Sequence, residues 1–140
     1  MLERLKALGG ATRSPEGHFS SDERRLIDIA IRAAEVARRL EFSVYVGPTE
    51  PDHRDYAERM HAVMASPDRS VLIMINPDDR AFEIVTGQAV RRVMTDQQVQ
   101  LAAMTMRSSF VQKDLVGGIV AGVAMLGQAA RGPQTLHAAP

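Results

Sequence analysis

The stretch SVLIMINPDDRAFEIVTGQAVRRVMTD, residues 70–96, carries the clearest structural signal in this chain. It opens with five consecutive apolar residues at 71–75, and a Pro-Asp-Asp turn follows. An apolar run of this length, bounded by a turn, is typical of a strand that helices cover on both faces. The alternating residues 82–86 then predict a second strand, which ends at Gly87. The stretch therefore predicts a protein of the α/β class.

The lengths of the connections predict the directions of the strands. Only five residues, 76–80, join the two strands of this stretch, so they form an antiparallel hairpin. Upstream, the β-branched and aromatic segment 42–46 predicts a further strand, and a helix from Pro51-Asp52 to about Ser66-Pro67 follows it. A strand, a helix and a strand with short loops form a βαβ unit, whose two strands are parallel. The sheet is therefore predicted to be mixed.

Three more helices complete the prediction. A capping-box spacing at Ser20 and Glu23 starts a helix that runs to about Arg39, and a second box at Thr95 and Gln98 starts another. The last helix, 114–130, contains four glycines, which we interpret as close packing against the sheet. We predict one Rossmann-like α/β sandwich, with a mixed three- to four-stranded sheet and helices on both faces.

The predicted domain has a segment on each side of it. Glycines and prolines interrupt residues 1–18, which predicts a flexible N-terminal arm. The α/β domain then occupies residues 19–131, and residues 132–140 are predicted to form a disordered tail.

The composition excludes several classes of protein. Seventeen basic and seventeen acidic residues give a net charge of zero, which does not suit a nucleic-acid-binding protein. Without cysteine there are no disulfides, thiolate metal sites or cysteine nucleophiles. The N-terminus has no apolar signal-peptide core, and the longest apolar tract, 115–127, spans only about 20 Å as a helix. We therefore expect a cytoplasmic protein, either free or peripheral to a membrane.

Four carboxylates follow the ends of the two strands that are predicted to be parallel. These are Glu50, Asp52, Asp78 and Asp79. Ligands of open α/β sheets bind beyond the carboxyl ends of parallel strands, where these side chains converge. Carboxylate oxygens suit Ca²⁺ or Mg²⁺, and such an ion assists phosphoryl hydrolysis. Alternatively, Asp78 and Asp79 serve only the turn and Asp52 only caps a helix.

Three further charged residues are candidates for a site. Asp96 joins the carboxylates if residues 88–95 run back along the sheet, and otherwise it only offsets the dipole of its helix. Arg91 and Arg92 either receive a phosphate or an acidic partner, or are solvated. His53 and His61 lack the spacing of helical metal ligands, so we assign them structural or surface roles.

Residues 40–130 resemble the TPM domain family, and an uncharacterised actinobacterial subset of that fold most of all. The resemblance rests on the strand VLIMI, the turn Asp79-Arg80, the strand FEIVTG, the helix start Met94-Thr95-Asp96 and the glycine-bearing helix DLVGGIVAGVAML. Asp96 is the acid that best matches the family by position. Two departures are Gly87-Gln88-Ala89, where the family has Gly-aromatic-Gly, and the absence of a signal peptide and anchor.

The resemblance implies a domain that maintains membrane-protein complexes, with metal binding or weak acid phosphatase activity in some members. We expect a non-catalytic TPM-like module that binds a protein partner at a membrane complex, with its oligomeric state open. The alternative is a weak acid phosphatase that uses Ca²⁺ or Mg²⁺ at the carboxylates. An enzyme requires these acids to converge within about 6–8 Å in a concave pocket. A binding module instead exposes an apolar patch.

Overall fold

The computed structural model describes residues 19–35 and 39–132. The predictions of a flexible arm at 1–18 and of a disordered tail beyond Gly132 lie outside these residues.

The described residues contain one sheet of three strands in the order β1-β2-β3. The strands are β1 (Glu41–Val46), β2 (Ser70–Asn76) and β3 (Ala81–Thr86). β1 runs parallel to β2, with Val44 beside Ile73, and β2 runs antiparallel to β3, with Ile73 beside Ile84. The predicted mixed sheet, with its βαβ unit and its hairpin, is therefore confirmed.

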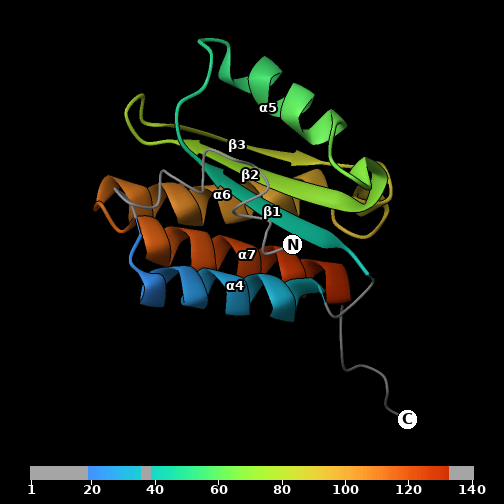
Figure 1. The fold of residues 1–140 in the computed structure, drawn as a ribbon. Coiled ribbons are helices and arrows are strands. Elements are labelled where there is room, and N and C mark those ends of the chain that lie inside the picture. The colour runs from blue at the N-terminus through green and yellow to red at the C-terminus, as the bar shows by residue number, and fades with distance from the viewer. Residues whose placement is uncertain (1–18, 36–38, 133–140) are drawn as a thin grey trace.

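Helices cover both faces of the sheet, as predicted (Figure 1). α4 (Ser21–Glu35), α6 (Asp96–Val111) and α7 (Leu115–Arg131) form a layer on one face, whereas α5 (His53–Ala62) lies alone on the other. Two short 3₁₀ helices, η1 (Pro67–Arg69) and η2 (Val90–Arg92), lie in the connections before β2 and after β3. The structure is thus an α/β sandwich with unequal layers.

The predicted helix starts are correct, but α5 ends earlier than predicted. Ser20 and Glu23 exchange side-chain hydrogen bonds with each other's backbone N–H, and Thr95 and Gln98 do the same at α6. α5 ends at Ala62, before the predicted Ser66-Pro67, because the chain turns there and enters η1. Arg39 has a φ of 56°, a left-handed conformation that an α-helix cannot contain, so the first helix does not extend to it.

β2 separates a large core from a small one. All seven of its residues are buried, and successive side chains point to opposite faces. Val71, Ile73 and Ile75 join the large core beneath α4, α6 and α7. Leu72 and Met74 belong to the small core beneath α5, with Tyr45, Ala57 and Val85. The sheet is therefore packed against a much larger apolar core on the face that three helices cover.

The glycines of α7 permit close packing, but against helices and not against the sheet as predicted. A Cβ atom at Gly122 would lie 2.5 Å from Met106 Cγ of α6, and one at Gly127 would lie 2.8 Å from Ala34 Cα of α4. A Cβ at Gly118 would similarly strike the ring of Phe110. The glycines therefore let α7 lie tightly between its two neighbouring helices.

None of the helices in the described ranges is both long enough and apolar enough to cross a membrane.

Candidate functional site

The predicted carboxylates do follow the ends of parallel strands, but partners already hold most of them. Glu50 and Asp52 lie between β1 and α5, and Asp78 and Asp79 lie in the turn between β2 and β3. Glu50 Oε1 accepts a hydrogen bond from Arg59 Nη2 at 2.5 Å. Asp52 caps α5, because its Oδ1 accepts from the backbone N–H of Asp55 at 3.0 Å. The capping alternative for Asp52 is confirmed.

Asp79 belongs to a polar network that joins the β2–β3 turn to the start of α5. Its Oδ2 lies 2.9 Å from His53 Nε2 and accepts from Asn76 Nδ2 at 3.2 Å. Asn76 is buried, and its Nδ2 also donates to Thr49 Oγ1 at 3.0 Å, while its Oδ1 accepts from the Asp79 backbone N–H. Since both the amide and the carboxylate are engaged, the network fixes the shape of the turn.

Two arginines of α5, Arg54 and Arg59, form ion pairs with nearby carboxylates. Arg59 also bonds Asp55 at 2.9 Å, and these bonds to Asp55 and Glu50 raise its pKa. For Arg54, burial acts to lower the pKa, but hydrogen bonds and charge interactions with Glu58 and Glu83 outweigh it and the pKa is raised. Both guanidinium groups therefore remain charged beside their carboxylates.

Sequence reasoning missed these arginines, although a signal was present. Arg54 and Glu58, and likewise Asp55 and Arg59, have the i,i+4 spacing of helical ion pairs. Within the described ranges, no group of three or more His, Asp or Glu side chains is arranged to hold a metal ion. Of the four predicted carboxylates, Glu50 and Asp79 thus lie beside a basic side chain, and the four do not form an open cluster of negative charge.

Asp96 lies at the other end of the sheet. The rings of Phe110, in the last turn of α6, and Phe82, at the start of β3, pack edge to face at 5.1 Å. α6 has 16 residues and is about 24 Å long. Asp96, in its first turn, therefore lies far from the end of the sheet where Phe82 and the β2–β3 turn are found. Residues 88–95 do not run back, because the Ala89 N–H bonds to Asp68 O in η1, just before β2 begins. The structure therefore does not bring Asp96 to Asp78 and Asp79.

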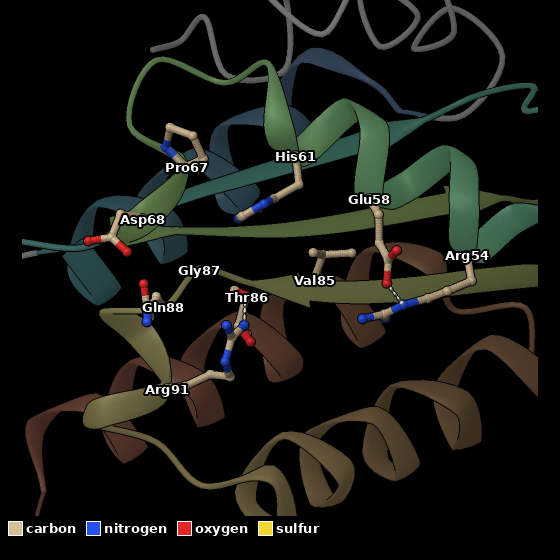
Figure 2. Close-up of a pocket in the computed structure, with 10 residues that line it drawn as sticks. All are labelled: Arg54, Glu58, His61, Pro67, Asp68, Val85, Thr86, Gly87, Gln88 and Arg91. Atoms are coloured by element: carbon tan, nitrogen blue, oxygen red, sulfur yellow. Dashed lines mark hydrogen bonds and ion pairs between the residues drawn. The ribbon is translucent and has the colours of Figure 1, made fainter.

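Arg91 lines a shallow polar hollow of about 410 Å³ between α5, η1 and the end of β3 (Figure 2). Its guanidinium donates to the carbonyl oxygen of Thr86, and Arg54 approaches the hollow from α5. His61 is buried above it, with Nε2 3.0 Å from Ser70 O. Arg92 is exposed and does not line the hollow. The predicted arginine pair is thus divided, and it lies at the end of the sheet opposite to the Asp79 turn.

The outer face of α6 is unusually poor in charge. Asp96 and Arg107 are the only charged residues among its sixteen. Leu101, Met104 and Val111 are 55%, 65% and 75% exposed, and their spacings of three and seven place them on one side of the helix. On its inner face, Ala102 and Met106 belong to the large core. The scarcity of charge at residues 96–111 is the signal in the sequence for this surface.

The chain resembles other proteins in sequence and in fold. A family model described as "Domain of unknown function (DUF5130)" matches residues 5–127. An uncharacterised protein of Mycobacterium tuberculosis, found in strains CDC 1551 / Oshkosh and H37Rv, is 27% identical over 100 residues. That match covers 71% of this chain, which spans 60% of the length of these relatives.

Three solution structures share the fold. The BA42 protein of Bizionia argentinensis has a TM-score of 0.72 and 24% identity, and the match covers 79% of this chain and 80% of that one. The N-terminal domain of the cg2496 protein of Corynebacterium glutamicum has a TM-score of 0.67 and 18% identity, covering 81% and 75%. An N-terminal domain from P. gingivalis has a TM-score of 0.64 and 18% identity, covering 81% and 76%. At these identities the likeness concerns the fold alone.

Proposed function

The chain belongs to the DUF5130 family, and from that premise we propose that it is a non-catalytic domain that binds a protein partner. The observation that carries this proposal is the outer face of α6, formed by Leu101, Met104 and Val111. An exposed row of large apolar side chains is typical of surfaces that a partner covers. The family description itself assigns no activity.

The chemistry of the α6 face indicates what kind of partner fits it. Leu101 and Met104 are one turn apart, and methionine adapts its shape to different apolar surfaces. Arg107 is exposed on the next turn and has no acidic partner within 4.0 Å among the residues that the structure describes. A partner surface that combines apolar side chains with a carboxylate would complement both features.

The resemblance to the TPM family suggests where such a partner is found. It implies a component of a membrane-protein complex, with this domain as a peripheral, TPM-like module that helps to maintain the complex. The shared fold of the three solution structures is compatible with this, but the membrane location depends on the resemblance at residues 40–130.

Replacing Met104 with glutamate is expected to weaken binding to the partner by at least about tenfold, since a buried, unpaired carboxylate costs more than 1.4 kcal/mol. The partner is first identified in the native host by photo-crosslinking from a benzoylphenylalanine at position 104 and mass spectrometry of the adduct. Its affinity for wild-type and variant domains is then measured by isothermal titration calorimetry.

Val63→Glu is the matched control for this experiment. Val63 is 83% exposed, but it lies at the end of α5 on the opposite side of the sheet. We expect the Val63 variant to bind like the wild type. Equal affinities of wild-type, Met104→Glu and Val63→Glu domains, or a crosslink only to a second copy of this chain, would contradict the proposal.

The alternative function is metal-assisted phosphate-ester hydrolysis at the carboxylate rim. We use this name for the four carboxylates that follow β1 and β2, which are Glu50, Asp52, Asp78 and Asp79. Asp78 favours it, because its side chain has no ion pair or hydrogen bond among the described residues and it adjoins Asp79. A divalent ion would have to replace His53 beside Asp79. Arg91 and Arg92 would not reach the phosphate, since they follow the last residue of β3, at the opposite end of the sheet from the β2–β3 turn.

Thermal melts with Ca²⁺ or Mg²⁺ separate the two functions. A site that is saturated at one hundred times its Kd would stabilise the fold by about 2.7 kcal/mol, which raises Tm by several degrees. Our proposal expects an unchanged Tm and no turnover of p-nitrophenyl phosphate. If Tm rises in the wild type and in Asp28→Asn, a remote control on α4, but not in Asp78→Asn, the carboxylate rim binds the ion.

A further inference from the structure

A larger cavity, of about 670 Å³, lies on the three-helix side of the sheet at the end of β2. The β2–β3 turn forms one wall and the connection between α6 and α7 forms another. Its apolar lining includes Phe82, Phe110, Val111 and Leu115. The volume is in the range of pockets that bind small organic molecules, and the mixed lining is also typical of them.

Three cations line the same cavity. They are Arg80 from the turn, Arg107 from α6 and Lys113 from the α6–α7 connection. None of the three has a carboxylate within 4.0 Å among the residues that the structure describes. The guanidinium of Arg107 lies 5.6 Å from the centre of the Phe82 ring. The cavity therefore combines an aromatic wall with positive charge that no acid of the described chain neutralises.

The backbone at two of these cations is held in an uncommon conformation. Arg80 has a φ of 54° and Lys113 a φ of 64°, in the left-handed region that glycine and asparagine adopt more readily. Such conformations cost about 1 kcal/mol or more and gather at functional sites. The chain nevertheless places a basic residue at both positions, each beside the cavity.

We propose that this cavity binds a small amphiphilic organic acid. The apolar body of the ligand packs on Phe82 and Phe110, and its anionic group lies among Arg80, Arg107 and Lys113. Charge complementarity carries the inference, because an uncharged apolar ligand would leave three cations unpaired and a bare phosphate would leave the aromatic wall uncovered. The inference goes beyond the proposed protein partner. Leu101 and Met104 do not line the cavity, and only Arg107 and Val111 border both surfaces.

A pair of fluorescent probes tests this directly. 8-Anilinonaphthalene-1-sulfonate carries an anionic group, and N-phenyl-1-naphthylamine has the same aromatic body without it. We expect the sulfonate probe to bind the folded chain at least about tenfold more tightly, because a bond to a charged group contributes about 1.5–3 kcal/mol. Amide chemical shifts should change at Phe82, Phe110 and Leu115. Equal affinities of the two probes, or shifts confined to other regions, would overturn the proposal.

Charge-removing variants that suit the backbone provide the second test. The double variant Arg80→Asn/Lys113→Asn removes two cations with a residue that accepts a positive φ. We expect it to lose about tenfold or more in affinity for the sulfonate probe and to keep its affinity for the neutral one. Arg39→Asn is the matched control, because Arg39 is exposed and has a φ of 56° but precedes β1 at the other edge of the sheet. An equal loss in Arg39→Asn would overturn the proposal.

Competition then identifies the class of ligand. Decanoate, kept below its micelle concentration, should displace the sulfonate probe from the wild type. Decanol, which lacks the charge, should not. Displacement by a capped Asp-Phe peptide but not by decanoate would show that the cavity binds a segment of a protein. That result would overturn the assignment to a small organic acid. Arg107 and Val111 border both surfaces, but the variants tested here change Arg80 and Lys113, and the partner test uses Met104, which does not line the cavity. This inference and the proposed function can therefore fail separately.

Discussion

Replacing Gly87 with alanine is expected to destabilise the fold by about 3 kcal/mol or more, at the upper end of the costs of overpacking. A Cβ atom there would lie 2.0 Å from Pro67 O and 2.4 Å from Asp68 O. The glycine cannot easily move away, because its N–H bonds Ser70 O at 3.0 Å and its carbonyl accepts from Arg91 N at 3.1 Å. Urea unfolding followed by circular dichroism measures the loss.

Gly122→Ala in α7 is the comparison for this experiment. A Cβ at Gly122 would also meet a neighbour, but the nearest atoms are Sδ and Cγ of the Met106 side chain, which can adopt another rotamer. Alanine also gains about 1 kcal/mol of helix propensity over glycine. We expect a much smaller loss, of about 1 kcal/mol or less. If both variants lost the same stability, the backbone clash at Gly87 would not be the cause.

The second large effect concerns the two faces of β2. Ile73→Ala should cost about 3–4 kcal/mol, because Ile73 is fully buried in the large core that three helices cover. Met74→Ala removes an equally buried side chain from the small core, which only α5 covers and which can collapse more easily. We therefore expect about 2 kcal/mol for Met74.

Denaturant unfolding of both variants, with fitted m-values, measures this difference. The order of the two losses is the informative result, since both side chains leave the same strand and neither carries a charge. A loss at Met74 equal to that at Ile73 would mean that the single helix holds its face as rigidly as the three-helix layer does.

Local signals in the sequence predicted most of the fold. The five-residue connection at 76–80 permits only a hairpin, and the capping boxes at Ser20 and Thr95 mark helix starts through contacts that span three residues. The three solution structures share this fold. Helix ends were less predictable, because the turn after Ala62 is not marked by glycine or by an immediate proline.

Contacts between distant segments were less accessible to sequence reasoning. Glycines at 118, 122 and 127 indicate a close neighbour, but their pattern does not say whether it is a helix or a sheet. Glu50 resembles a free metal ligand in the sequence, because its partner, Arg59, lies nine residues away on the next helix. The cavity with Arg80 and Lys113 needs two turns that are 33 residues apart, and no local spacing predicts their meeting.

The unequal layers also set the order in which the molecule opens. α5 rests on a small core and on surface ion pairs such as Arg54–Glu83, which salt screens. We expect the amide protons of β2 to exchange only when the whole structure unfolds, and those of α5 to exchange in a smaller, local fluctuation. Such an opening would expose His61 and the floor of the polar hollow while the cavity on the other face, and the outer surface of α6, stay intact.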